Sequence, residues 1–334
     1  METFSSVNFQ SQIEIVQKVI DLSWEGLGYK RIIKQIKKDF SVNLSLGLLS
    51  YWFNHDVKMF GGQNHFLKKP TKELAYVLGV MFGDGNIFYH KKKQDYVVRL
   101  EAIDRDFVEH FSKCVSKVLS KETNYAVVRY KQKAMGSFMY FARARSKELY
   151  YFIKELKEDF EKVKPFANAY PKEFIQGLAD SEGCPSISAR NSFQVGVVVA
   201  VSTNENLLMF VCDLLFKSFE IKTKLRLQHK AGKTDSIING RSITRTMNLY
   251  SLIIARVEDT KTYSKLIGFS IKRKQNKLIG GGNIFEKFSV SERVFEWKKR
   301  YYKPKSKWIN QKTKKISSID VLTLSPGLEP ESHP

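Results

Sequence analysis

A nine-residue pattern occurs twice in this chain of 334 residues, and the repetition restricts the folds open to it. The first copy, residues 77–85, reads VLGVMFGDG, and the second, residues 175–183, reads IQGLADSEG, 98 positions later. Each copy joins an apolar run to a single carboxylate that is followed by glycine. Such a duplication predicts two related halves that meet at a pseudo-symmetric site with paired carboxylates.

The first copy lies in a predicted helix over residues 73–83, for which Thr71 is the expected N-cap. Small residues four apart share one face of a helix, and both copies have them: Ala75, Gly79 and Gly83 in the first, and Gly177 and Ser181 in the second. Glycine inside a helix costs about 1 kcal/mol relative to alanine. Glycines at matching places therefore predict two helices whose backbones pack very closely, a geometry best described for membrane helices.

Asp84 and Glu182 are expected at the C-termini of these helices, where the following glycines serve as C-caps. A carboxylate there faces the negative end of the helix dipole, and two such carboxylates brought together also repel each other. Mg²⁺ relieves both problems, since it binds one or two carboxylates together with waters and substrate phosphates. We therefore expect a Mg²⁺ site, with Mn²⁺ as a possible substitute, at Asp84 and Glu182 with Gly83 and Ser181 beside them.

The duplication extends beyond the motif. Residues 104–118 and 204–219 align at an offset of 100, and both have apolar residues at helical spacing. Alternating, strand-like segments lie before and after each of these helices: 96–102, 125–130 and 138–144 in the first half, and 193–201, 222–227 and 247–254 in the second. The predicted fold is therefore α+β, a pseudo-two-fold pair of αββαββα repeats.

These motifs resemble those of the LAGLIDADG homing endonucleases, in the single-chain form that carries both copies. The resemblance covers roughly residues 73–280, and residues 268–278 also resemble the end of the second repeat in archaeal intron-encoded members. It implies two halves joined at the motif helices, with a saddle of antiparallel strands that lies on duplex DNA. It also implies that Asp84 and Glu182 are the metal-binding acids, one near each scissile phosphate.

The sequence departs from the family where many members place a basic residue near each metal site. The corresponding segments, 101–104 and 201–204, read EAID and VSTN and contain no lysine. Lysines from neighbouring strands are the expected substitutes, with Lys131 and Lys224 as candidate catalytic residues and Lys222 as a further option.

The charge of the chain narrows the class of partner. Lys and Arg outnumber Asp and Glu by 56 to 34, which gives a formal net charge of +22 and favours a polyanion as the partner.

No apolar run is long enough for a transmembrane helix, the N-terminus lacks the pattern of a signal peptide, and no Walker A loop or zinc-ligand spacing is present. Three cysteines without ligand spacing are expected to be buried thiols. We expect a cytoplasmic monomer without membrane contact.

The segments outside the duplication predict additional parts. Residues 1–60 contain three helical runs that resemble a helix-turn-helix, and a plain three-helix packing unit is the alternative. In a helix-turn-helix the third helix enters the major groove, which makes candidate contacts of Ser45, Leu46, Gly47, Ser50, Tyr51 and Asn54. Residues 61–72 are the expected linker, 73–165 and 166–282 the repeats, and 283–334 a basic aromatic extension with a Pro-rich, disordered tail. That extension suits either phosphate contact with base stacking or packing of its aromatics on the core.

Outward-facing strand residues are the expected readers of the major groove, with Arg suited to guanine and Asn or Gln suited to adenine. The candidates in the first repeat are His90, Lys91, Lys92, Lys93, Arg99, Arg129, Lys131, Lys133 and Arg143. Those in the second repeat are Ser186, Ser188, Arg190, Asn191, Gln194, Arg226, Gln228 and Lys230. The three consecutive lysines are expected at a hairpin tip that touches phosphates without reading sequence.

Together these features favour a Mg²⁺-dependent, site-specific double-strand DNA endonuclease with a long asymmetric target and staggered products. By the resemblance, its role is the mobility of the intron that encodes it. Three rivals stay open: an RNA maturase that binds intron RNA, a non-catalytic transcription regulator, and an inactivated endonuclease. Retention of both acids favours cleavage over the first two, although the first can coexist with cleavage as a dual role, and the missing lysines keep the third open.

Overall fold

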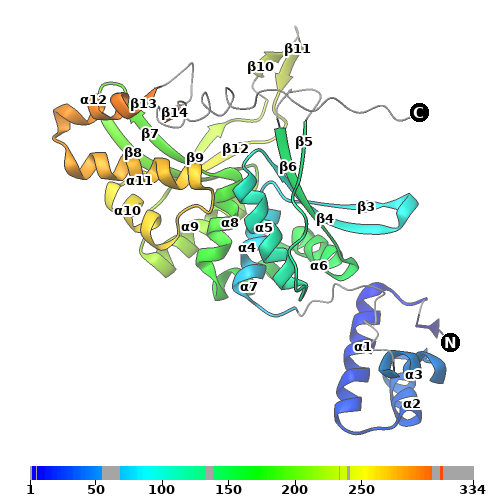
Figure 1. Cartoon of the computed structure of the whole chain (residues 1–334). Coiled ribbons are helices and arrows are strands. Elements are labelled where there is room, and N and C mark those ends of the chain that lie inside the picture. Colours follow the sequence, from blue (N-terminus) through cyan, green and yellow to red (C-terminus); the bar gives the residue numbers. More distant parts are fainter. Residues whose placement is uncertain are drawn as a thin grey trace, which may run out of the picture.

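The computed structural model describes residues 2–4, 6–54, 68–131, 138–232, 234–238, 241–302 and 309–310, and the following concerns these residues. They form an N-terminal helical unit and a larger body built from the two predicted repeats (Figure 1). No helix among them combines the length and the apolar character that crossing a membrane requires.

The N-terminal unit has its own hydrophobic core, which includes the completely buried Ile15, Ile32 and Leu49. Ser45, predicted to cap the third helix, accepts a hydrogen bond of 3.0 Å from the backbone N–H of Leu48. Its elements are β1 (Glu2–Thr3), α1 (Phe9–Trp24), α2 (Tyr29–Phe40), β2 (Val42–Asn43), which pairs in parallel with β1, and α3 (Leu46–Asn54).

The first repeat has the predicted αββαββα order, and its four strands form an antiparallel sheet in the order β3-β4-β6-β5. Its elements are α4 (Lys72–Met81), β3 (Asn86–His90), a 3₁₀ turn (Lys91–Lys93), β4 (Asp95–Ala102), α5 (Arg105–Val118), β5 (Val128–Lys131), β6 (Phe138–Arg145) and α6 (Lys147–Glu158). A 3₁₀ turn (Phe160–Val163) and α7 (Lys164–Ala169) lead to the second repeat.

The second repeat has the same order, with one addition, the hairpin β10–β11 between β9 and β12. Its main sheet is antiparallel in the order β7-β8-β12-β9. The elements are α8 (Pro171–Glu182), β7 (Cys184–Ala189), β8 (Phe193–Ser202), α9 (Glu205–Phe219), β9 (Lys224–His229), β10 (Thr234–Ile238), β11 (Arg241–Thr244), β12 (Leu249–Ile254) and α10 (Val257–Leu266), followed by α11 (Lys272–Lys287), α12 (Val290–Arg300), β13 (Tyr301–Tyr302) and β14 (Ile309–Asn310).

The motif helices α4 and α8 lie side by side at the centre of the body and carry the contact between the repeats (Figure 1). A Cβ atom added at Gly79 would collide with the backbone oxygen of Phe174, and one added at Gly177 would collide with the backbone oxygen of Tyr76. The glycines predicted to allow close packing are thus the places where the two backbones touch. One hydrophobic core runs through both repeats around this contact.

The ends of the motif helices differ from the prediction. Helix α4 ends at Met81, so Asp84 lies in the following turn rather than at the helix terminus, whereas Glu182 is the last residue of α8. Gly183, the C-cap of α8, has an extended backbone (φ −98°) and not the left-handed conformation for which glycine is usually selected there. A side chain on it would collide with the backbone oxygens of Val199 and Ala179, at 2.5 and 2.7 Å, so close packing requires this glycine.

The C-terminal extension packs its first aromatic residues on the core of the second repeat. Trp297 is completely buried, stacks on Tyr301 with ring centroids 3.9 Å apart, and also contacts Phe193 of β8. These two rings are therefore core residues and do not stack on nucleic acid. The Pro-rich tail lies outside the described residues.

Candidate active site and nucleic-acid interface

The close contact between the motif helices brings Asp84 and Glu182 together. A Cβ atom built on Gly83, next to Asp84, would collide with the side chain of Ser181 and lie 3.2 Å from Cγ of Glu182. The turn that carries one acid therefore touches the residue that carries the other. The four residues predicted for the metal site, Gly83, Asp84, Ser181 and Glu182, come together at this junction.

The two acids also share an electrostatic environment. Partial burial raises the pKa of Asp84, although the residue as a whole is exposed to solvent. Burial also raises the pKa of Glu182, and the negative charge of Asp84 raises it further. Like charges held close together in partly dehydrated surroundings favour a bound cation, because the cation restores the charged form of both groups.

The described residues contain no group of three or more His, Cys, Asp or Glu side chains arranged to hold a metal ion. A cation here would therefore depend on two carboxylates, with the remaining positions left to backbone oxygens, water and substrate. This donor set of hard oxygen atoms fits Mg²⁺ or Mn²⁺ and does not fit a structural zinc site.

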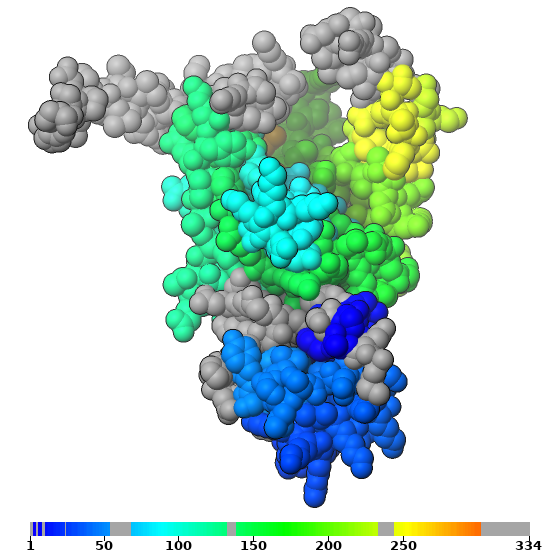
Figure 2. Space-filling model, turned by 90° about the vertical axis from the view of Figure 1, so that its right-hand side faces the viewer, coloured from blue at the N-terminus to red at the C-terminus, as the bar shows by residue number. Residues whose placement is uncertain are grey.

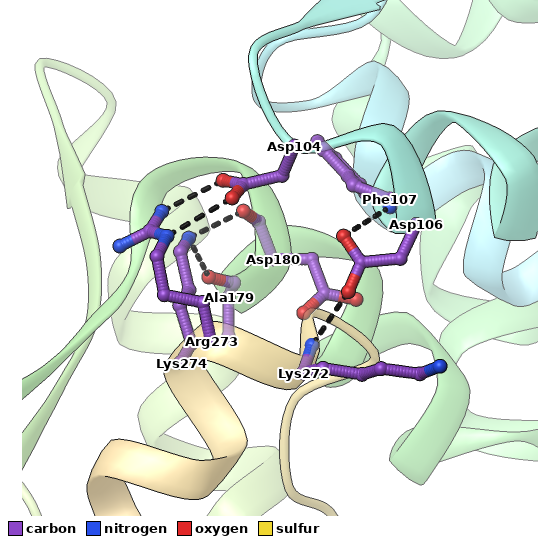
Figure 3. Close-up of polar contacts among 8 residues, drawn as sticks. All are labelled: Asp104, Asp106, Phe107, Ala179, Asp180, Lys272, Arg273 and Lys274. Atoms are coloured by element: carbon purple, nitrogen blue, oxygen red, sulfur yellow. Dashed lines mark hydrogen bonds and ion pairs between the residues drawn. The ribbon is translucent and has the colours of Figure 1, made fainter. Parts of the chain in front are cut away.

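Lys274, in the first turn of α11, is the basic residue that the sequence reasoning missed (Figure 3). Its side chain is buried, and its ammonium group donates hydrogen bonds to the carbonyl oxygens of Asp180 (2.6 Å) and Ala179 (3.4 Å), at the end of α8. Its positive charge lowers the pKa of both Asp84 and Glu182, against the effect of burial. A lysine buried without a carboxylate ion pair in the described structure is the signal that identifies it.

Asp180, two residues before Glu182, links the two repeats by hydrogen bonds. The hydroxyl of Tyr76 in α4 donates to its carboxylate at 2.9 Å, and the hydroxyl of Ser270 donates at 2.6 Å. Burial raises the pKa of Asp180 to about 6, while these hydrogen bonds act in the opposite direction by stabilising the charged form.

A second link joins the start of α11 to the N-cap and the first turn of α5. Asp104 accepts two hydrogen bonds from the guanidinium of Arg273, at 2.9 and 2.7 Å, and Asp106 accepts one from the backbone N–H of Lys272 at 2.7 Å (Figure 3). Because α11 has cations and no acid in its first turn, these two aspartates supply the negative charge that its N-terminus favours. Lys274, whose charge acts on both acids, thus comes from α11 and not from the strands.

In the second repeat the strand register places several predicted DNA contacts on one face. Ser188 pairs with Gln194 and Ser186 with Gly196, on the side opposite the buried Val195 and Val197. We call this the outer face, because α9 and α10 cover the other side of the sheet. Arg226, opposite Ser251, and Lys224, opposite Ile253, lie on the same outer face.

In the first repeat the register divides the candidates between the two faces. Arg99 and Arg143 pair with each other on the outer face. Arg129 pairs with Tyr140, and Lys131 pairs with Phe138. Along β6, Tyr140 and Phe138 are two and four residues from the buried Ala142, so Arg129 and Lys131 lie on the face opposite the outer face. The guanidinium of Arg129 stacks on the Phe138 ring at 3.6 Å. The register therefore gives no support to the predicted roles of Arg129 and Lys131.

The position of Lys224 also bears on its predicted catalytic role. Cys184, Val198, Ile253 and Lys224 form one row across the sheet, so Lys224 lies three strands from the strand that follows Glu182. At about 4.8 Å per strand this separation is roughly 14 Å, which suits a DNA contact better than a contact with the acid.

The cysteines were expected to be buried, but Cys184 is exposed.

Most of the remaining candidates lie in exposed turns and strand ends. The predicted hairpin tip is the 3₁₀ turn Lys91–Lys93. The side chains of Lys133 and Asn54 lie outside the described structure. The other exposed candidates are His90, Arg190, Asn191, Gln228 and Lys230, and in the N-terminal unit Ser45, Leu46, Gly47 and Tyr51, with Ser50 half-buried. In the space-filling view the strands of the two repeats rise on either side of a hollow, green on the left and yellow on the right (Figure 2).

Several known proteins are similar to this chain. Residues 169–268 match the family model described as a LAGLIDADG-like domain. Uncharacterized protein MJ0398 of Methanocaldococcus jannaschii is 28% identical over 266 residues, which cover 80% of this chain and 92% of that protein. Among solved structures, I-DmoI in complex with DNA and Mn covers 60% of this chain and 98% of its own, at 18% identity and a TM-score of 0.39. The homing endonuclease I-WcaI bound to its DNA recognition sequence covers 67% and 93%, at 11% identity and a TM-score of 0.43.

The body of the molecule is a duplicated αββαββα unit whose two central helices each end beside one acid. Residues 169–268, within its second repeat, match the model of a LAGLIDADG-like domain, and its first repeat has the same order of helices and strands, which confirms the resemblance inferred from the two motifs.

Proposed function

We propose that this protein is a site-specific DNA endonuclease that hydrolyses both strands of duplex DNA with the help of Mg²⁺ or Mn²⁺. The observation that carries the proposal is the contact between the ends of α4 and α8, which places Asp84 beside Glu182. Two carboxylates with raised pKa values, in a chain of net charge +22, suit the joint binding of a cation and a phosphate.

In this proposal Asp84 and Glu182 hold the cation, and each serves mainly one DNA strand. The bound metal supplies Lewis-acid chemistry, which favours ionisation of water and neutralises charge on the leaving oxygen. Lys274 acts through the acids, since its charge favours their ionised forms. The carbonyl groups that it binds fix the end of α8, on which Glu182 sits.

The outer faces of the two sheets are the proposed DNA-binding surface. Arg99 and Arg143 of the first repeat are suited to phosphate or guanine, and Ser188 and Gln194 of the second to neutral hydrogen bonding with base edges. Because the two halves differ in sequence and charge, the target is long and asymmetric. The protein acts as a monomer, and its cleavage promotes the mobility of the intron that encodes it.

The test is cleavage of the intronless host allele by the purified full-length protein. We expect staggered double-strand products that depend on Mg²⁺ and disappear with a chelator. Tight binding of that DNA without any cleavage would reject the enzyme and direct attention to the intron RNA, the substrate of a maturase.

A further inference from the structure

The N-terminal unit carries a strongly basic helix face that the proposed endonuclease site does not use. Helix α2 presents five exposed cations, and at 100° per residue they all lie within an arc of about 120°: Lys30, Arg31, Lys34, Lys37 and Lys38. We call these five residues the α2 basic face. The buried Ile32 and Ile36 lie on the opposite side of the helix, so packing fixes the direction in which the basic face points.

None of these five cations forms an ion pair with a residue in the described part of the chain. The nearby Asp39 instead accepts hydrogen bonds from Gln35, at 2.9 and 3.0 Å. Three of the unit's acids, Glu14, Asp21 and Glu25, lie on α1 or at its end. The unit is therefore polarised, with its positive charge concentrated on one helix although its total charge is small.

The basic face leads into the start of α3. A hollow lined by Gly28, Tyr29, Lys30, Arg31 and Leu46 joins the beginning of α2 to the beginning of α3. Leu46, which lines this hollow, and Tyr51, further along α3, are large and exposed. Helix α2 has Gly28 as its N-cap, which offers no side-chain hydrogen bond, and its first turn contains no acid. This end of the unit combines uncompensated cations with an uncapped helix start, and both features complement a polyanion.

We propose that the α2 basic face, with the exposed start of α3, binds the sugar–phosphate backbone of duplex DNA outside the stretch covered by the two sheets. The proposal rests on the proposed endonuclease function and adds a second, independent DNA contact to it. Residues 55–71 separate the unit from α4 and, as seventeen residues, span at most about 60 Å. At about 3.4 Å per base pair, that reach corresponds to roughly 18 base pairs.

The test compares the salt dependence of DNA binding by three full-length proteins, with no divalent metal, so that cleavage is not required. The probe is a mixed-sequence duplex of about 60 base pairs, which exceeds the combined span of both contacts. The variant Lys34→Gln/Lys37→Gln/Lys38→Gln neutralises part of the basic face. The control Lys154→Gln/Lys217→Gln/Lys265→Gln neutralises three exposed lysines on α6, α9 and α10, which cover the inner faces of the sheets. Thermal melting verifies that all three proteins fold alike.

We expect the α2 variant to reduce the slope of log affinity against log salt by about 2–3, since each lost phosphate contact removes about 0.9. The control is expected to change that slope by less than about 1. Equal slopes for the α2 variant and wild type, or an equal reduction of the slope in the control, would each overturn the proposal. A reduced slope seen only when a structured RNA replaces the duplex as the probe would overturn it too. Absence of cleavage by wild type, with the slope difference intact, would instead reject the endonuclease and leave this contact standing.

Discussion

The ammonium group of Lys274 lies 2.6 Å from the carbonyl oxygen of Asp180, in the last turn of the helix that ends at Glu182. This hydrogen bond attaches the start of α11 to the end of motif helix α8. It also holds a buried positive charge near both Asp84 and Glu182, whose pKa values it lowers. Among the described residues, a cation whose charge acts on both acids thus comes from a helix that follows both repeats.

Replacing Lys274 by methionine is expected to weaken metal binding more than it weakens the fold. Without the cation, the pKa values of Asp84 and Glu182 rise further, so the pH of half-maximal Mn²⁺ binding shifts upward. The cost in folding free energy is expected to stay within about 2 kcal/mol, because methionine is buried more easily than an ammonium group. Calorimetric Mn²⁺ titrations between pH 5 and pH 8 measure the shift. Lys272→Met, at an exposed side chain in the same turn, is the matched control; an equal shift in both variants would contradict the role of Lys274.

The glycine contacts between α4 and α8 predict whether each alanine substitution raises or lowers the free energy of unfolding. Gly79→Ala and Gly177→Ala each place a methyl group against a backbone carbonyl of the other helix. We expect each to lower the free energy of unfolding by about 1–3 kcal/mol, although alanine favours helix formation. Urea denaturation measures this. Gly282→Ala, in α11 with open space around it, is expected to stabilise by up to about 1 kcal/mol. Unchanged stability of the first two variants would mean that the helices are farther apart.

The buried carboxyl of Asp180 predicts a pH dependence of stability. Burial raises its pKa from the ordinary 3.8 to about 6, so between these values the folded protein holds a proton that the unfolded chain releases. The contribution of Asp180 to stability is therefore greatest at low pH and falls as the pH rises through that window. Asp180→Asn does not titrate. The difference in unfolding free energy, wild type minus variant, is expected to decrease between about pH 4 and pH 6 and stay level above. A difference that rises with pH would refute the assignment.

The pair of Arg273 and Asp104 predicts a modest, salt-sensitive coupling between α11 and the first repeat. The guanidinium donates two hydrogen bonds, yet the Arg273 side chain is 68% exposed, so water screens much of the attraction. A double-mutant cycle with Arg273→Ala and Asp104→Ala is expected to give a coupling of about 0.5–1 kcal/mol. Repeating the cycle in concentrated salt separates charge from packing, since a coupling that persists unchanged would not be electrostatic.

The sequence allowed the repeat architecture and the paired acids to be predicted because local signals specify both. Apolar spacing located the helices, and glycines at matching places in α4 and α8 indicated the close contact that brings Asp84 to Glu182. The cap at Thr71 was also predictable, and it accepts a hydrogen bond of 3.1 Å from the backbone N–H of Leu74.

The features missed from the sequence depend on tertiary placement. Lys274 is one of many lysines, and only the packing of α11 against the end of α8 distinguishes it. The faces occupied by Arg129 and Lys131 follow from strand register, which a short edge strand does not specify through its own sequence pattern. The sequence around Trp297 is compatible with either a buried or a solvent-exposed ring. Trp297 is buried because it packs on Phe193 in the sheet of the second repeat.

The most direct test of the account is strand-resolved cleavage of a target labelled on both strands, by wild type, Asp84→Asn and Glu182→Gln. With Mg²⁺ or Mn²⁺, wild type is expected to cut both strands at staggered positions, and each variant is expected to bind the same DNA but make no double-strand break. Undiminished double-strand cleavage by either variant would contradict the claim that the paired acids at the junction of α4 and α8 form the active site.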